Sequence, residues 1–301
     1  IIFYPDNSLP RAYFKAILPG GIRSETQIQN GIGHCFTQMW GNGSERYSKS
    51  TIKQKVENNG AHLYGSLGNN TMFYTLDTLT EDISTLFPLF CHTFRHPIFK
   101  NEELEKIKRI TCQSISERTD DWYRLGMYTF KKEFFKTHPY QLSRLGEKDS
   151  ITPITTSDLS DYFQTRLNPN HLIISASGQY NESEILQMAE REFQGLVGPS
   201  TDQKAPYSPI ERPLHTSKKD HTISIPQEVA ALFIGFDGLT FLEPENAIQL
   251  DLVDAVLSGM SYPGGRLHTM LRDKGLVYLI HAANHPGIEP GYFLIYALTT
   301  P

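Results

Sequence analysis

The sequence predicts an α+β fold in which helices cover mostly antiparallel sheets. Segments with strand character and segments with helical periodicity interleave, but a hairpin at residues 61–76 and several consecutive helices interrupt a regular strand–helix alternation. Hydrophobic residues make up 39% of the chain and charged residues 20%, which is typical of an ordinary globular protein. A length of 301 residues is enough for about two domains.

The first half of the chain contains most of the predicted elements. A strand over residues 11–18 ends at Pro19-Gly20-Gly21, and a helix over 31–40 follows it. Strands at 61–67 and 71–76 are separated by Gly68-Asn69-Asn70, which is the spacing of a β-hairpin. Further helices are expected to begin near residues 50, 83, 101, 122, 156 and 183, with a strand over 171–176.

The order of elements then starts again. A stretch rich in Pro, Ser, Lys and Gly predicts a linker over 198–222, between a domain at 1–197 and a second domain at 223–301. The second domain is expected to have a strand at 229–236, a helix carrying Val253 and Val256, a short helix at 266–272, and strands near 276–283 and 291–299. Because the sequence stops directly after a strand, we expect this second unit to be truncated.

Composition narrows the classes of partner. The chain has 28 basic and 33 acidic residues, a net charge of −5, so we expect no nucleic-acid partner. No apolar run approaches the roughly 20 residues of a membrane span. Cys35, Cys91 and Cys112 are far apart and odd in number, which predicts reduced thiols rather than a disulfide scaffold. The compartment stays open between cytoplasm, periplasm and an organelle.

The helix at residues 31–40 resembles a metal-binding helix but lacks most of the side chains that would bind the metal. In the motif His-x-x-Glu-His, two histidines four residues apart hold zinc from one helix face, and the glutamate acts as general base. Here the corresponding positions are His34, Thr37 and Gln38. One possible ligand is kept, the base is replaced by a hydroxyl, and the second ligand is replaced by an amide. We therefore predict no metal site in this chain.

Other candidate motifs are weaker. His92 and His96 have ligand spacing on a helix, and His281 and His285 have it on a strand, but neither pair has a third ligand nearby in sequence. The loop 259–265 lacks the Gly-Lys-Ser/Thr ending of a phosphate-binding loop. Each is predicted to be structural.

In their order along the chain, several short sequence motifs resemble those of the insulinase/pitrilysin (M16) zinc peptidases, which include the mitochondrial processing peptidase. The resemblance covers nearly the whole chain. The motifs that carry it lie at residues 31–44, 57–61, 96–99, 120–121, 138–140, 168–170, 177–178, 264–267 and 271–278. It implies two homologous domains, each a mostly antiparallel sheet covered by helices, that enclose a peptide-sized chamber. One half of such an enzyme carries the zinc motif and a downstream glutamate ligand, and the other half has often lost them.

Residue roles follow from the resemblance alone. The downstream ligand position falls on Ser114, 80 residues after His34, so a third metal position departs from the family pattern. Glu105 or Glu117 would replace it only with a shifted helix register. Arg272 and Tyr278 resemble the family's pair that reaches across the chamber and contacts substrate at the zinc site.

The resemblance thus predicts a non-catalytic half or subunit of an M16 metallopeptidase that binds peptide or unfolded polypeptide. No cofactor is expected in this chain. Zinc is expected in an active partner half, either fused upstream or present as a separate subunit. Two alternatives stay open: a purely structural module derived from a peptidase, and a divergent active zinc peptidase with other ligands.

Overall fold

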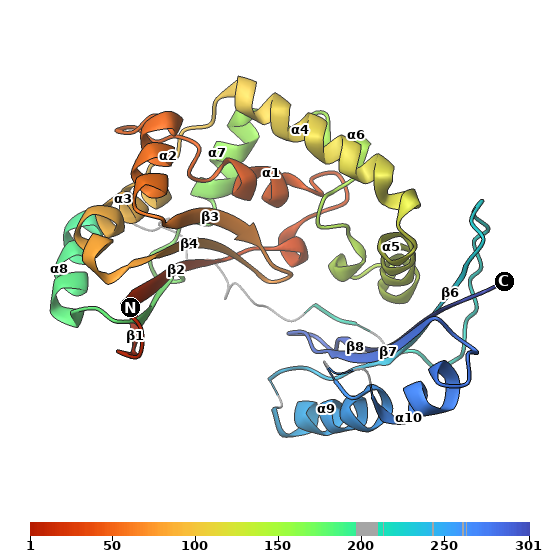
Figure 1. Cartoon of the computed structure of the whole chain (residues 1–301). Helices are drawn as coiled ribbons and strands as arrows, with labels where there is room; N and C mark the ends of the chain where they lie inside the picture. The colour runs from red at the N-terminus through yellow and green to blue at the C-terminus, as the bar shows by residue number, and fades with distance from the viewer. Residues whose placement is uncertain (197–209, 213, 243, 261, 263) are drawn as a thin grey trace. The chain divides into compact units, whose positions relative to one another are not determined.

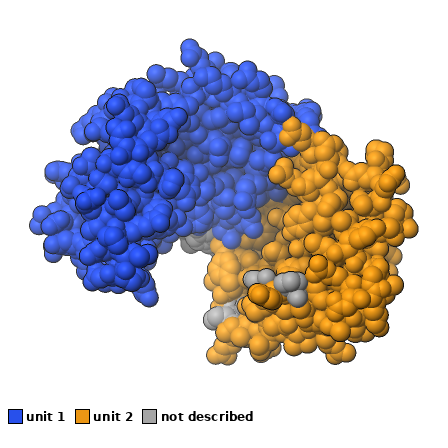
Figure 2. Space-filling model, viewed as in Figure 1, with its two compact units in different colours: residues 1–116, 142–208 blue, residues 117–141, 209–301 orange. Residues whose placement is uncertain are grey.

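Two compact units make up the protein. The structure is a computed structural model that describes residues 1–196, 210–212, 214–242, 244–260, 262 and 264–301. Unit 1 comprises residues 1–116 and 142–208, and unit 2 comprises residues 117–141 and 209–301 (Figure 2). Residues 117–141 therefore pack with the second half of the chain, although the sequence returns to unit 1 after them.

A five-stranded sheet forms the centre of unit 1, in the order β1-β5-β2-β4-β3 (Figure 1). The strands are β1 (Ile2–Pro5), β2 (Arg11–Pro19), β3 (His62–Leu67), β4 (Thr71–Leu79) and β5 (Ile173–Gly178). Strands β3 and β4 form the predicted hairpin, and β2 pairs with β4 from Arg11 opposite Leu79 to Pro19 opposite Thr71. Only the pairing of β1 with β5 is parallel among the described strands.

Helices cover one face of this sheet. They are α1 (Ile32–Met39), α2 (Lys49–Asn58), α3 (Ile83–Arg95), α4 (Asn101–Ser116), α6 (Lys148–Ile151), α7 (Thr156–Gln164) and α8 (Glu182–Phe193), with short 3₁₀ turns η1 (Ile22–Ser24) and η2 (Thr80–Asp82). Along β2, Ala12, Phe14, Ala16 and Leu18 are at most 1% exposed, because alternate residues of a strand point to the same face. Phe87 of α3 covers Phe14, with ring centroids 4.7 Å apart.

Helix α1 begins at a buried carboxylate. Glu25 is 4% exposed and accepts hydrogen bonds from the backbone N–H groups of Gly31, at 2.8 Å, and Gly33, at 3.0 Å. The side-chain amide of Asn30 donates to the same carboxylate at 2.9 Å. A side chain at position 33 would lie 2.8 Å from Glu25, so the glycine makes room for the carboxylate. Glu25 therefore satisfies N–H groups that a helix start leaves without partners.

Unit 2 is built on a three-stranded antiparallel sheet in the order β6-β8-β7. Its elements are η3 (Glu117–Asp120), α5 (Trp122–Phe135), η4 (Pro139–Gln141), β6 (Ala230–Asp237), α9 (Pro244–Ser258), α10 (Gly265–Leu267), the π-helical turn η5 (His268–Arg272), β7 (Leu279–His285) and β8 (Tyr292–Thr299). Helix α5 packs on one face, where a Cβ at Gly126 would lie 2.0 Å from the Phe233 ring. Helix α9 lies on the other face, where Ser258 donates to the carbonyl of Ala282 at 3.1 Å.

The two sheets repeat one arrangement. In each, a first strand is followed by a helix and then by a hairpin whose second strand pairs with the first strand, which gives β2-β4-β3 and β6-β8-β7. Helix α1 contacts β3 in the same way that α9 contacts β7. The repeat confirms the predicted α+β class with mostly antiparallel sheets covered by helices.

Several sequence predictions differ from the structure in detail. The strand expected near 276–283 begins at Leu279, because residues after Arg272 form a turn through Gly275, whose φ is +70°. Residues 197–209, where the linker was predicted to begin, lie outside the described residues, so the boundaries 1–197, 198–222 and 223–301 stay a prediction. The three cysteines are free, as predicted. Among the described residues, no helix is both long and apolar enough to cross a membrane.

Candidate functional site

The first candidate site lies where α1 meets α4. His34, on α1, is half-buried, and its Nε2 shares a hydrogen bond of 3.2 Å with Oγ1 of Thr111, which is 3% exposed on α4. Burial, with the nearby Arg144 cation as a smaller cause, lowers the pKa of His34 to about 4. The imidazole is therefore neutral at pH 7, and the nitrogen that faces α4 is engaged by a hydroxyl.

The other motif positions have different surroundings. Thr37 is 2% exposed, and its hydroxyl donates within the helix to the carbonyls of Gly33, at 2.9 Å, and His34, at 3.1 Å. Gln38 is exposed at the end of α1, and Ser114 is half-buried on α4, one turn after Thr111. The structure thus joins His34 to Thr111 rather than to Ser114, the position that the resemblance indicated.

These side chains do not fit a catalytic zinc ion. Such an ion takes three protein ligands from imidazole, thiolate or carboxylate groups, whereas this set offers one imidazole, two hydroxyls and an amide. Over the residues that the structure describes, no three His, Cys, Asp or Glu side chains are grouped to hold a metal, and this includes the surroundings of His92, His96, His281 and His285. A threonine hydroxyl also cannot replace a carboxylate as general base at neutral pH.

The second candidate site is the turn that carries Arg272 and Tyr278. Arg272 ends the π-helical turn η5, in which the N–H of Asp273 donates to the carbonyl of His268 five residues earlier, at 2.9 Å. Short π-helical segments occur frequently at functional sites. The Arg272 carbonyl accepts a hydrogen bond from Gly275 at 2.8 Å, so the turn closes immediately after the arginine.

The far end of this turn is attached to the sheet. The N–H of Tyr278 donates to the carbonyl of Leu298 on β8 at 2.8 Å, and the hydroxyl of Thr299 donates to the carbonyl of Leu276 at 2.9 Å. The backbone is therefore held, while the side chain of Tyr278 is 60% exposed and that of Arg272 is also exposed. The turn presents a guanidinium and a phenol, both hydrogen-bond donors, to the surroundings of unit 2.

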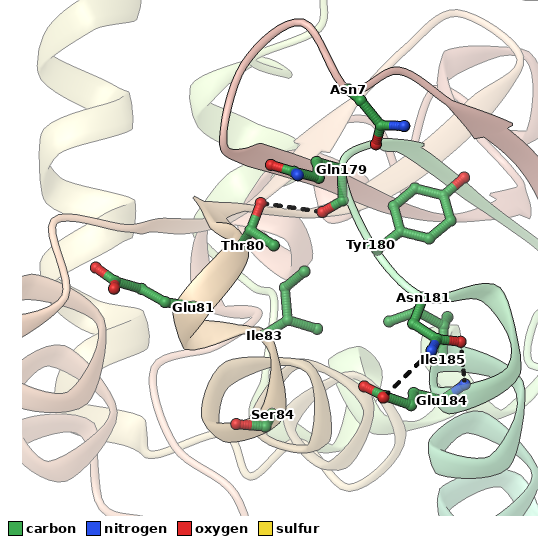
Figure 3. A pocket seen from close by; sticks show the side chains of 10 residues that line it. All are labelled: Asn7, Thr80, Glu81, Ile83, Ser84, Gln179, Tyr180, Asn181, Glu184 and Ile185. Carbon is green, nitrogen blue, oxygen red and sulfur yellow. Dashed lines mark hydrogen bonds between the residues drawn. The ribbon is translucent and has the colours of Figure 1, made fainter.

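A hollow of about 450 Å³ lies elsewhere in unit 1, near the starts of α3 and α8 (Figure 3). Its polar groups form hydrogen bonds with neighbouring backbone groups. Asn181 caps α8 by accepting from the N–H groups of Ser183 and Glu184, and Thr80 donates to the carbonyl of Gln179 at 3.0 Å. It contains none of the candidate residues from the sequence.

Sequence reasoning missed two residues that form hydrogen bonds with the motif helix α1. Thr111 is the hydrogen-bond partner of His34, and Glu25 holds the start of α1. The position of Thr111, three residues before Ser114 on one helix, was a usable signal because residues at that spacing share a face. Glu25 gave no comparable signal, since its role depends on a loop folding back over six residues onto Gly31.

Comparison with known proteins identifies the family. The family model described as "Insulinase (Peptidase family M16)" matches residues 6–148, and the model described as "Peptidase M16 inactive domain" matches residues 153–301. The chain belongs to the M16 peptidase family. The predicted resemblance is thereby confirmed over almost the whole sequence.

Named M16 relatives include enzymes and a respiratory-complex subunit. An "Uncharacterized zinc protease" of Rickettsia bellii is 25% identical over 282 residues, which cover 93% of this chain and 66% of that protein. Subunit 1 of the bovine mitochondrial cytochrome b-c1 complex is 20% identical over 261 residues, which cover 86% of this chain and 54% of that protein. The chain thus spans no more than about two thirds of the length of these curated relatives.

Solved M16 structures share the fold. A crystal structure of a peptidase M16 inactive domain from Pseudomonas fluorescens has a TM-score of 0.86 and 22% sequence identity, and the match covers 99% of this chain and 71% of that chain. At this identity the likeness establishes the fold only. The two repeated sheets described above are therefore the M16 arrangement.

Proposed function

We propose that this chain is the zinc-less half of an M16 metallopeptidase. An active partner half supplies the zinc ion and the general base, and this chain completes a chamber that holds an extended or unfolded polypeptide. Arg272 and Tyr278 reach the substrate at the partner's zinc site. The guanidinium holds a peptide carbonyl, and the phenol stabilises the negative charge that develops on the oxygen during hydrolysis.

One contrast carries this proposal. The positions on α1 and α4 offer a neutral histidine bonded to a hydroxyl, whereas the turn after η5 keeps two exposed donors on a fixed backbone. Within the part of the chain that the structure describes, the side chains of Arg272 and Tyr278 form no hydrogen bond or ion pair, so a contact with substrate would break none. A catalytic half would instead need metal ligands and a general base at the positions on α1 and α4.

An edge strand supports the peptide-binding part. Strand β3 is the last strand of its sheet and pairs with β4 on one side only, which leaves backbone donors and acceptors for an added strand. A Cβ at Gly65 would lie 2.4 Å from the carbonyl oxygen of Thr37, so β3 runs directly against α1. An extended peptide added to β3 would lie beside the degenerate motif helix.

The test uses the protein mixed with its active M16 half. Neither zinc nor hydrolysis is expected for the protein alone, and mixing should give turnover of an unfolded, fluorogenic peptide. In the mixture, Arg272→Ala should lower kcat by roughly 10²-fold, the scale of losing one oxyanion donor. Arg266→Ala, an exposed arginine in the same segment, is the matched control. Gel filtration establishes that each variant still pairs.

Unchanged turnover for Arg272→Ala in an intact pair would refute the catalytic part of the proposal. Stoichiometric zinc with hydrolysis by the protein alone would refute all of it, and would favour a divergent peptidase.

A structural role is the second candidate function. The similarity to subunit 1 of the bovine cytochrome b-c1 complex favours it, because that relative is named as part of a respiratory complex. Such a role would require neither Arg272 nor Tyr278. Copurification with a large assembly that contains no zinc-motif subunit, together with normal assembly of the double variant Arg272→Ala/Tyr278→Ala, would support this candidate over the first.

A further inference from the structure

The face of the five-stranded sheet opposite the helices of unit 1 carries aromatic side chains close to one lysine. On β2, Tyr13, Lys15 and Ile17 alternate with the fully buried residues and point away from the helices. The strand register places further residues on the same face, because paired residues share a face: Asp77, Thr75 and Phe73 on β4, Tyr64 on β3, and Ile173 on β5. We call these residues, with Tyr13, Lys15 and Ile17, the open face.

Two aromatic rings lie close to the ammonium group of Lys15. Its Nζ lies 5.4 Å from the ring centroid of Tyr13 and 5.1 Å from that of Phe73, which are cation–π distances. The hydroxyls of Tyr13 and Tyr64 are 3.4 Å apart, so two tyrosines from different strands meet over the sheet. Tyr64 and Ile173 are each 45% exposed, so apolar and aromatic surface is available on both sides of the lysine.

Charge on the open face is locally unbalanced. Asp77 is already paired with Arg11, whose Nε donates to it at 2.6 Å. Lys15 forms no ion pair within 4.0 Å with any carboxylate of the described chain. Since the protein as a whole has a net charge of −5, an acidic ligand would be repelled by the surface in general and attracted at this lysine.

We propose that the open face binds a polypeptide segment in which a carboxylate side chain is flanked by aromatic or aliphatic residues. The carboxylate pairs with Lys15, and the flanking side chains pack on Tyr13, Tyr64 and Phe73. This inference deepens the proposed function and rests on it, because it specifies which substrate segments the zinc-less half prefers. Complementary charge selects this occupant, because a lysine between two aromatic rings matches an anion that has apolar groups on either side.

The site is built to hold such a segment rather than to attract any anion. The aromatic rings restrict the lysine side chain, so less conformational freedom is lost when its ammonium group pairs. Apolar neighbours lower the local exposure to water and strengthen the ion pair relative to one on an open surface. A free anion without flanking apolar groups would gain only the charge contact.

The binding test uses a matched pair of fluorescein-labelled peptides and the purified protein. One peptide has a single Glu between Phe and Leu residues, and its twin has Gln in place of Glu. Fluorescence anisotropy should give a Kd about fivefold to tenfold lower for the Glu peptide, which corresponds to roughly 1–1.4 kcal/mol. Lys15→Met should remove that difference, and Lys15→Glu should reverse it.

Lys53→Met provides the matched control. Lys53 is a surface lysine on α2, 66% exposed and 3.6 Å from Glu57, so its loss should leave the preference for the Glu peptide intact. Tyr64→Ala should weaken both peptides alike, because it removes packing surface and no charge. Circular dichroism of each variant establishes that the fold is kept.

Three results with the peptides would overturn the inference: equal affinity for both peptides, a preference that survives Lys15→Met, or no binding of either peptide. Dimers of the wild-type protein that Tyr64→Ala dissociates would also overturn it, because a second copy would then be the occupant. These outcomes differ from failure of the proposed function, which is judged by Arg272→Ala in the assembled pair. Turnover that depends on Arg272 but not on Lys15 would leave that function standing.

Discussion

Strands β2 and β6 hold the same place in the two repeated sheets, yet they differ sharply in burial. On the face that carries α1, the β2 residues Phe14 and Ala16 are fully buried. On the face that carries α9, the β6 residues Leu232, Ile234 and Phe236 are 54%, 40% and 52% exposed. Both strands have apolar residues at alternate positions, so the sequence pattern alone does not explain the difference.

The covering helices explain it. Helix α3 lies over β2 and β4, with Phe90 stacked on Tyr74 at 5.5 Å between ring centroids. Helix α9 instead lies over β7, where the side-chain amide of Asn284 donates to Asp251 at 3.0 Å. A strand is buried only when a further element covers it. In the described part of unit 2, α9 and the turn η5 contact β7, and α10 packs on α9.

Helix α9 extends the exposed apolar surface. Ile248, Leu252 and Val256 recur every four residues along one side of the helix and are 58%, 63% and 58% exposed. Like the β6 residues, they are large apolar side chains that the described part of unit 2 leaves exposed. Unit 1 is therefore closed on its helical side, whereas unit 2 is open on the corresponding side.

The largest expected effect tests this contrast directly. Phe14→Ala should lower the free energy of unfolding by about 3–5 kcal/mol, because it leaves a cavity between β2 and α3. Phe236→Ala should change it by less than about 1 kcal/mol, because half of that ring is already in water. Urea denaturation followed by circular dichroism measures both. Equal losses for the two variants would mean that β6 is covered in solution.

A second test concerns how closely the helices approach the sheets. Gly65→Ala should cost about 3 kcal/mol, the upper end for overpacking, because the new Cβ would meet the carbonyl oxygen of Thr37 at 2.4 Å and neither backbone has room to move. Gly60→Asn is the control, since no atom lies within 4 Å of a Cβ there and asparagine tolerates its φ of +57°. A small loss for Gly65→Ala would show that α1 and β3 separate easily.

The smallest expected effect concerns pH. The pKa of His34 is lowered by burial from 6.5 to about 4, so the unfolded chain binds a proton at a higher pH than the folded one. Stability contributed by His34 is therefore complete above pH 6.5 and is lost as the pH falls toward 4. The loss is at most about 3 kcal/mol, and nearer 1–2 kcal/mol for a half-buried side chain.

His34→Gln should flatten the fall in stability between pH 6.5 and 4, because glutamine does not titrate and still offers a polar group to Thr111. The exposed His62 provides the control, and His62→Gln should keep the wild-type slope. The measurement is the urea midpoint at intervals across this range. Identical slopes for His34→Gln and the wild type would assign the pH dependence to other groups.

Much of the fold followed from local sequence. The helix at 122–135 begins at the predicted residue because Asp121 caps it and accepts from the N–H groups of Tyr123 and Arg124. The hairpin at 61–76 followed from its turn residues. The packing of residues 117–141 with unit 2 was not predictable, since it depends on Gly126 meeting Phe233 more than 100 residues later.

For the candidate sites too, local features were predictable from the sequence and contacts between distant elements were not. The position of His34 on α1 and the loss of its neighbouring ligands could be read from the sequence. Its bond to Thr111 could not, because it depends on the side-by-side placement of two helices. The π-helical turn before Asp273 was also missed, because a single widened turn leaves no trace in hydrophobic periodicity.

Glu25 has a consequence for how such a protein matures in the cell. A helix whose first N–H groups are held by a buried carboxylate takes its shape without waiting for an ion. Proteins that fold around a metal depend on the supply of that metal, and chelators unfold them. In this chain the motif helix is anchored by its own loop, so zinc starvation of the cell should leave its abundance unchanged even where a zinc-dependent partner is lost.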